Sequence, residues 1–299
     1  MFEITPKGVF DLANQNQYFG GWPTLKNDPK TLVMAFPVEG WKGSAAVTVQ
    51  QEADGRIIGQ VYGADEISEK AKSQALAALS LDIAAEDWPQ VGKRDSVIGE
   101  LQLKYNFLRP NLFHSPYEAA SGFIIGHRRS IHQKAEVMKH LAEEFGEKLV
   151  VGGQVFHAFP EPRVLLTLER YEGLNVQKIE RLHSVAKSAL DGLLERDLLR
   201  SLPIEVALSK LETLPGVGPF FAQGILHRGA GLVDDITRDD LTDYAIQKAY
   251  QLQVAPDQKK VNLISQPWRP FRMWATILLH IWVRREIGIL PGRRASSTR

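Results

Sequence analysis

The stretch LPGVGPFFAQGIL, residues 214–226, constrains the fold of this 299-residue chain more than its other segments do. It joins two runs whose apolar residues have helical spacing, IEVALSKLETL and FFAQGILHRG. Pro215 ends the first run, and Pro219 suits the first position of a second helix. Gly216 and Gly218 can take positive φ, and they leave the backbone uncovered. The pattern predicts a helical hairpin over residues 205–228 that another molecule can approach closely.

The turn of this hairpin also predicts a chemistry. Backbone N–H groups at the start of the second helix would face outward, where an anion such as a DNA phosphate is favoured. Such a site needs no overall positive charge, and the chain has a net charge of +1. The alternative is a helical interaction module whose hairpin is only structural.

The sequence before and after about residue 105 differs in character. Three short β-branched runs (30–41, 44–52 and 56–63), with a hairpin signal at 53–55, precede a helical run at 67–79. From residue 115, where Ser115-Pro116 with Glu118 predicts a capped helix start, helical spacing prevails. We therefore expect an α+β protein, with a small antiparallel sheet domain at 1–105 and a helical region at 106–299.

Composition excludes several classes of site. The chain has no cysteine, which excludes disulfides, thiolate zinc sites, cysteine nucleophiles and cysteine-bound iron–sulfur clusters. No apolar run has the length of a membrane span, and no signal peptide is evident. We expect a cytoplasmic, nucleoid-associated monomer with no membrane partner.

The hairpin and an acid pair downstream, Asp239 and Asp240, resemble the helix-hairpin-helix DNA glycosylase superfamily. The chain is most similar to its 3-methyladenine DNA glycosylase II branch, over nearly its whole length. Three further stretches carry this likeness: ALSLDIAAED, FLRPNLFHSPYEAASGFIIGHRRSIHQKA and PWRPFRMWATILLHIW. The resemblance implies a TATA-binding-protein-like sheet domain followed by an all-helical glycosylase region.

The resemblance also implies an activity, the hydrolysis of alkylated bases (3-methyladenine and 7-methylguanine type) from duplex DNA in base-excision repair. An ungapped count from the hairpin gives Asp240 the catalytic role and Asp239 a supporting one, with the reverse open. From the local sequence alone, both aspartates are expected to be helix-capping acids. Relatives with lyase activity have a lysine two residues after Gly218, where this chain has Phe220, so we expect a monofunctional enzyme. Uracil, hypoxanthine or an oxidised purine are alternative substrates, and an inactive DNA-binding protein is an alternative function.

Other expected site residues follow from the same resemblance. The DNA backbone is expected at the main chain of Leu214, Gly216, Val217 and Gly218. The base pocket is expected among Phe220, Phe221, Trp274 and Trp282, although a second ungapped count puts His280 in place of Trp282, and aromatic residues at helical spacing more often form core. In GHRRSIHQK, Arg128 stands where relatives insert a wedge, beside His127 and Arg129; a solvated helix face is the alternative. His127 departs from the usual glutamine.

The only cofactor that the resemblance suggests is a structural Na⁺ or K⁺ at the hairpin. It would be bound by the main-chain carbonyls of Glu212, Leu214 and Val217. The expected partner is double-stranded DNA that contains damaged bases.

Overall fold

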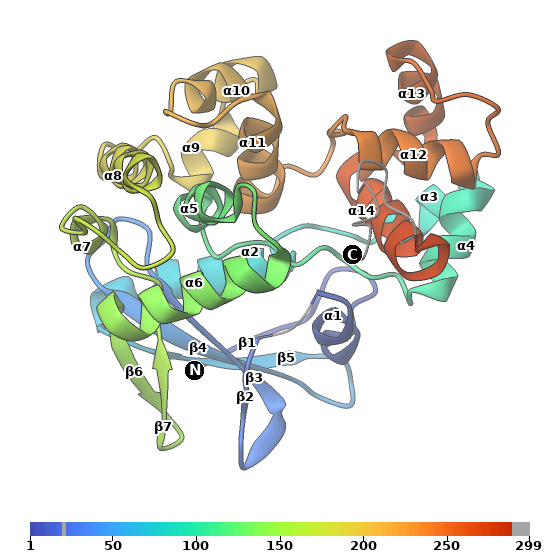
Figure 1. Cartoon of the computed structure of the whole chain (residues 1–299). Coiled ribbons are helices and arrows are strands. Elements are labelled where there is room, and N and C mark those ends of the chain that lie inside the picture. The colour runs from blue at the N-terminus through green and yellow to red at the C-terminus, as the bar shows by residue number, and fades with distance from the viewer. Residues whose placement is uncertain (20–21, 289–299) are drawn as a thin grey trace, which may run out of the picture. The chain divides into compact units, whose positions relative to one another are not determined.

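The computed structural model describes residues 1–19 and 22–288 (Figure 1). Contacts group them into two compact units, each assembled from segments far apart in the sequence. The first unit consists of the described residues of Met1–Pro6, Gly20–Ile83 and Asn111–Leu232. The second consists of those of Lys7–Phe19, Ala84–Pro110 and Val233–Arg299. The boundary expected at residue 105 stays a prediction, since these units group residues by contact and not by chain order.

The first unit contains a five-stranded antiparallel sheet with the strand order β1-β5-β4-β3-β2, which confirms the expected α+β class. The strands are β1 (Phe2–Ile4), β2 (Thr24–Leu25), β3 (Asp28–Pro37), β4 (Ser44–Gln51) and β5 (Ile57–Tyr62). The predicted turn between β4 and β5 is present, with Gly55 at a φ of +89°. Val33 on one face of the sheet, and Phe36 and Val47 on the other, are fully buried, as expected for β-branched and aromatic residues in a sheet covered on both faces.

Helix α2 (Ser68–Ala78) packs against β4 and β5. A second sheet, formed by β6 (Lys148–Val151) and β7 (Gln154–His157), interrupts the region that the sequence predicted to be all helical. Its turn is made by Gly152 and Gly153, both at positive φ. The expectation of an all-helical region is therefore corrected at this two-stranded hairpin, whose turn needs the conformations that glycine adopts without strain.

The helices of the first unit enclose one apolar core, to which Tyr117, Leu182 and Leu211 contribute fully buried side chains. They are α5 (Pro116–Gly126), α6 (Ile131–Phe145), α7 (Pro162–Leu165), α8 (Val176–Leu190), α9 (Arg196–Ser201), α10 (Ile204–Glu212) and α11 (Pro219–Gly224), with 3₁₀ and π turns at Asp65–Ile67 and Ile225–Ala230. The predicted start of α5 is confirmed, because the Ser115 hydroxyl accepts the Glu118 N–H at 3.1 Å.

The second unit is helical and is built around buried tryptophans. Its helices are α1 (Leu12–Phe19), α3 (Trp88–Arg94), α4 (Ser96–Lys104), α12 (Asp240–Ala249), α13 (Gln258–Ser265) and α14 (Arg272–Trp282), with 3₁₀ and π turns at Gln266–Trp268 and Val283–Ile287. Asp95 joins three of these segments, since its carboxylate caps α4 and accepts hydrogen bonds from Tyr250 and Trp268. This contact fixes the end of α12, the helix that begins at the acid pair. Within the described residues, no helix is long and apolar enough to cross a membrane.

One buried carboxyl in the first unit makes stability depend on pH. Burial raises the pKa of Glu39 to about 7, although Arg196 and Lys70 oppose the rise. Because an unfolded glutamate releases its proton near 4.5, the folded state binds more protons between these values, and stability is lost as pH rises through this window. We expect Glu39→Gln to exceed the wild type in unfolding free energy by about 1–3 kcal/mol at pH 8 and by less at pH 5.

Urea unfolding of both proteins at pH 5, 6, 7 and 8 measures this difference. Glu66→Gln, at an exposed carboxylate, is the matched control and should show no such trend. A difference between Glu39→Gln and the wild type that stays constant with pH would contradict the assignment.

Candidate functional site

The predicted hairpin is present as α10, a turn and α11. Leu214 and Val217 are buried in the core of the first unit, with 3% and 4% of their surfaces exposed. The Val217 N–H donates to the Leu214 carbonyl at 2.9 Å, which closes the turn. Gly216 and Gly218 are exposed. The turn is therefore anchored by two apolar side chains while its glycine backbone faces outward.

The backbone conformation and surroundings require glycine at one position of the turn but not at the other. Gly216 has a φ of +83°, and a methyl group on it would lie 2.5 Å from the Arg181 side chain. Gly218 has a φ of −93°, and a methyl group there would meet nothing within 4 Å. The fold therefore requires glycine at position 216 but not at 218. A glycine without a folding reason is typical of a place where the backbone approaches a ligand.

The aromatic pair of the hairpin connects it to the loop between α5 and α6. Phe221 stacks on Phe123, with ring centroids 5.3 Å apart, and the His127 ring meets Phe221 edge-on at 5.9 Å. Phe220 is 52% exposed. The structure thus brings together two segments that the sequence predicted to face DNA, the hairpin and the loop at residues 127–129.

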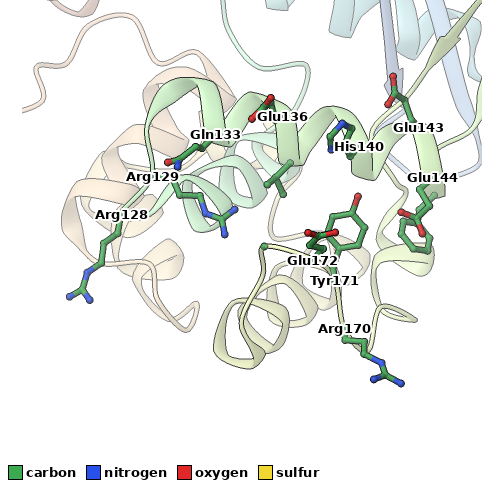
Figure 2. A pocket seen from close by; sticks show the side chains of 13 residues that line it. Arg128, Arg129, Gln133, Glu136, His140, Glu143, Glu144, Arg170, Tyr171 and Glu172 are labelled. Atoms are coloured by element: carbon green, nitrogen blue, oxygen red, sulfur yellow. The ribbon is translucent and has the colours of Figure 1, made fainter.

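The two arginines of this loop differ in exposure and in contacts. Arg128 is exposed and has a φ of +57°, a left-handed conformation that is uncommon for a side chain of its size. Arg129 is half-buried, and its guanidinium lies against Gly173. Figure 2 shows Arg128 pointing away from the other labelled side chains. Arg128 is therefore the residue at the loop's tip, and Arg129 supports the loop from one side.

A cleft of about 1100 Å³ lies beside Arg129, between α6 and the segment at residues 170–173 (Figure 2). Its charged lining is mixed, with Arg128, Arg129, Arg170, Glu136, Glu143, Glu144 and Glu172. These four carboxylates would repel DNA phosphates. The cleft is not the candidate site, because the acid pair belongs to the second unit.

The acid pair occupies the start of α12. Asp239 is the residue that caps the helix, and its Oδ1 accepts the Thr242 N–H at 2.6 Å. Asp240 is the first helical residue and is exposed, whereas Asp239 is half-buried. Arg284 supplies a positive charge nearby: burial lowers the pKa of Arg284, and attraction to Asp239 opposes that change. The carboxylate held in one place is therefore that of Asp239.

Arginines fix the segment that leads to this acid pair. Arg272 donates from Nε to the Asp234 carboxylate at 2.7 Å and from Nη2 to the Asp234 carbonyl. Arg238 holds the Asp243 carboxylate through two hydrogen bonds, of 3.0 and 2.5 Å. Asp243 is therefore occupied by an ion pair and is not a candidate for chemistry. Ion pairs therefore hold the chain on both sides of Asp239.

The aromatic candidates of α14 differ in exposure. Trp274 is 1% exposed and is surrounded by Trp88, Phe271 and the Arg109 guanidinium. Trp282 is half-buried. The His280 Nε2 is 2.9 Å from the Thr242 hydroxyl, and therefore lies beside the first turn of α12. Of the two tryptophans, only Trp282 keeps surface that a base could contact.

The described residues contain no group of three or more histidines, aspartates or glutamates that could hold a metal ion. This finding concerns side-chain ligands and leaves main-chain carbonyls out.

The comparisons with known proteins agree with this geometry. No family model matches the chain. The chain is 28% identical over 170 residues to DNA-3-methyladenine glycosylase 2 of Escherichia coli (strain K12), which is 56% of each chain. Its fold matches a 3-methyladenine DNA-glycosylase from Archaeoglobus fulgidus with a TM-score of 0.77 and 20% identity, over 95% of this chain and 98% of that one. An 8-oxoguanine glycosylase/lyase of Clostridium acetobutylicum, solved with duplex DNA, matches with a TM-score of 0.68 and 18% identity, over 94% and 93%.

These relatives and structural neighbours support the resemblance to the helix-hairpin-helix DNA glycosylase superfamily. The match to the curated relative spans about half the length of that protein.

Two basic residues that sequence reasoning missed connect the loop and the hairpin. The Lys178 Nζ donates to the carbonyls of Ile125 and His127, at 2.8 and 2.9 Å. Arg181, one turn further along α8, lies against Gly216. Burial lowers the pKa of Lys178, and repulsion from Arg129 and Arg181 lowers it further. The three-residue spacing of Lys178 and Arg181 puts both on one helix face, but only the fold shows what that face contacts.

Proposed function

We propose that this chain is a monofunctional DNA glycosylase that removes alkylated bases, of the 3-methyladenine and 7-methylguanine type, from duplex DNA. The observation that carries the proposal is the hairpin turn, which is anchored by Leu214 and Val217 and exposes a glycine at 218 that folding does not require. A DNA phosphate that approaches this backbone would explain that glycine. The resemblance to the DNA-3-methyladenine glycosylases supports the same interpretation.

The proposed reaction breaks the bond between a base nitrogen and C1′ of deoxyribose. Its transition state resembles an oxocarbenium ion, which a fixed carboxylate stabilises. The same carboxylate can orient or deprotonate the attacking water. Free N–H groups in the first turn of α12 favour a negative charge at this place.

We propose Asp239 as this carboxylate, and we assign Asp240 the supporting position. This is the reverse of the assignment given by counting from the hairpin, and it is the alternative that the sequence left open. The cap hydrogen bond to Thr242, the half-buried position and the nearby Arg284 favour Asp239. Asp240 is exposed, and none of these three features applies to it.

The absence of a lysine at the position two residues after Gly218 supports hydrolysis over lyase chemistry. Phe220 stands two residues after Gly218, and the sequence has no lysine between Lys210 and Lys248. An enzyme without an amine nucleophile there would use water, and would leave the sugar–phosphate strand intact.

Removal of a base from a duplex requires the nucleotide to be flipped out of the stack. We propose Arg128 as the side chain that enters the duplex, with His127 and Arg129 as the basic patch beside it. For stacking on the flipped base we propose Phe220, Phe221 and Trp282, which retain accessible surface. A positively charged alkylated purine would gain a cation–π contribution from such rings. Trp274 is left out because it is buried in the core of the second unit.

A monovalent cation at the hairpin also stays a proposal. The Leu214 carbonyl accepts the Val217 N–H, which leaves it a second lone pair for a Na⁺ or K⁺ that the carbonyls of Glu212 and Val217 would share. Such an ion would add positive charge for a phosphate. The Arg181 guanidinium already supplies positive charge at the same turn.

A comparison of substrates tests the proposed function. Duplexes that each carry one lesion (7-methylguanine, hypoxanthine, uracil or 8-oxoguanine), together with duplex DNA treated with a methylating agent, are incubated with the protein, and released bases are quantified by chromatography. We expect 3-methyladenine and 7-methylguanine from the methylated DNA. Release of another base alone would correct the substrate class. Tight binding with no release of any base would favour the inactive DNA-binding protein.

Arg181 provides a separate test of DNA binding at the hairpin. If its guanidinium contacts a phosphate, Arg181→Ala should weaken binding to any duplex, and the slope of log K against log salt should become shallower by about one. Fluorescence anisotropy over a series of KCl concentrations measures this slope. Arg163→Ala, at an exposed arginine of α7, is the control. An unchanged slope for Arg181→Ala would show that Arg181 makes no phosphate contact.

A further inference from the structure

The loop that carries Arg128 is held at both ends. On one side, the His127 N–H donates to the Ile124 carbonyl and the Arg129 N–H to the Gly126 carbonyl, at 3.4 and 3.0 Å. On the other side, Ser130 and Gln133 form a reciprocal cap at the start of α6. Arg128 sits between these anchors in a left-handed conformation. That conformation costs on the order of 1–2 kcal/mol for a residue other than glycine, so the surroundings must hold it.

Lys178 reaches this loop from another helix, α8, and donates hydrogen bonds to its backbone. Its Nζ bonds the carbonyls of Ile125 and His127, the last turn of α5 and the residue before Arg128. The last carbonyls of a helix lack partners within the helix, and a cationic side chain satisfies them well. Lys178 is itself fixed, because α8 begins at Val176 and the Asn175 side chain caps the Lys178 N–H at 2.9 Å.

We infer that Lys178 is a positioning residue for base extrusion: it clamps the carbonyls of Ile125 and His127 and thereby holds Arg128 ready to enter the duplex. The inference rests on the proposed function and extends it to a residue that makes its contacts within the protein. A loop that is already held in its working conformation does not have to become ordered when DNA binds. The conformational-entropy cost of ordering the loop is therefore not added to the step in which the base leaves the stack.

The alternative role for Lys178 is a direct contact with a DNA phosphate. The two roles predict different results. A phosphate contact would matter for every DNA, whereas a clamp that acts through Arg128 would matter only where a stacked nucleotide must be displaced.

The experiment compares Lys178→Gln with the wild type on two substrates, the released lesion in a paired duplex and the same lesion in a single-nucleotide bulge, where the stack is already open. We expect kcat/KM to fall about tenfold or more on the duplex and to change little on the bulge. A duplex with 2-aminopurine beside a tetrahydrofuran abasic analogue reports unstacking, and its fluorescence rise should shrink in the variant. Lys178→Arg, which can still donate to two carbonyls, should restore most of both signals.

Two further variants make the result specific. Lys187→Gln removes an exposed lysine from the last turn of the same helix and should behave as wild type. In an Arg128→Ala background, Lys178→Gln should cause no further loss, because a residue that acts only through Arg128 has nothing left to position.

Equal losses on duplex and bulge, or a loss that adds fully to that of Arg128→Ala, would overturn the inference. So would an unchanged duplex rate in a folded Lys178→Gln protein, as judged by its melting temperature. If the wild type released no base, the proposed function would fail, whereas the fluorescence comparison would still test Lys178.

Discussion

Replacing Asp239 by asparagine is expected to reduce base release by about 10²–10⁴-fold, the range by which a positioned acid–base group typically contributes. Asparagine is nearly the same size as aspartate and caps a helix equally well. The hydrogen bond to the Thr242 N–H should therefore survive, and stability and DNA affinity should change little. The loss would thus come from the missing negative charge. Single-turnover base release at saturating enzyme measures it, with a binding isotherm and a melting curve for the same variant.

Asp240→Asn is the matched control, because it removes the same charge from the adjacent, exposed position. We expect less than about a threefold loss for this variant, because a solvent-exposed charge is screened by water and salt. If Asp240→Asn lost activity and Asp239→Asn kept it, Asp240 would be the catalytic carboxylate, as the count from the hairpin indicates. The assignment of Asp239 from its position as helix cap would then be wrong. Equal large losses would mean that both carboxylates take part.

Alanine substitutions at the two hairpin glycines should distinguish an effect on stability from an effect on DNA affinity. Gly218→Ala has room for its methyl group in the free protein, so its unfolding free energy should stay within about 1 kcal/mol of wild type. A phosphate that approaches this backbone would meet the methyl group, and overlap of this kind costs on the order of 1–3 kcal/mol. We therefore expect DNA affinity to fall about ten- to hundredfold.

Gly216→Ala should behave differently. Its φ of +83° disfavours alanine, and the new methyl group would displace the Arg181 side chain. We expect a loss of about 1–2 kcal/mol in unfolding free energy. Urea unfolding and fluorescence anisotropy on both variants make the comparison. A Gly218→Ala protein with wild-type DNA affinity would show that the turn is only structural.

Much of the fold could be predicted from the sequence because its signals are local. The β-branched runs and the Gly55 turn predicted β3, β4 and β5 of the five-stranded sheet, but not the short strands β1 and β2. The proline–glycine pattern at 215–219 predicted the hairpin. The β6–β7 hairpin was missed, because it consists of two four-residue strands between helical runs. Short apolar stretches of this kind do not identify their own structure.

The candidate site was predicted less completely because its distinctions depend on packing. Counting from the hairpin favoured Asp240 over Asp239, whereas the structure makes Asp239 the helix cap and leaves Asp240 exposed. Aromatic spacing does not show that Trp274 is core while Phe220 is exposed. The contact of Lys178 with His127 spans 51 residues of sequence, so no local pattern could reveal it.

The central claim is that the protein releases damaged bases by hydrolysis at C1′. Methylated duplex DNA is incubated with the wild type in two portions, one without and one with sodium borohydride; released bases and strand breaks are measured in the first, and covalent adducts in the second. We expect free 3-methyladenine, strands that break only after alkali in the first portion, and no covalent protein–DNA adduct in the second. A borohydride-trapped adduct, strand breaks without alkali, or no released base would contradict it.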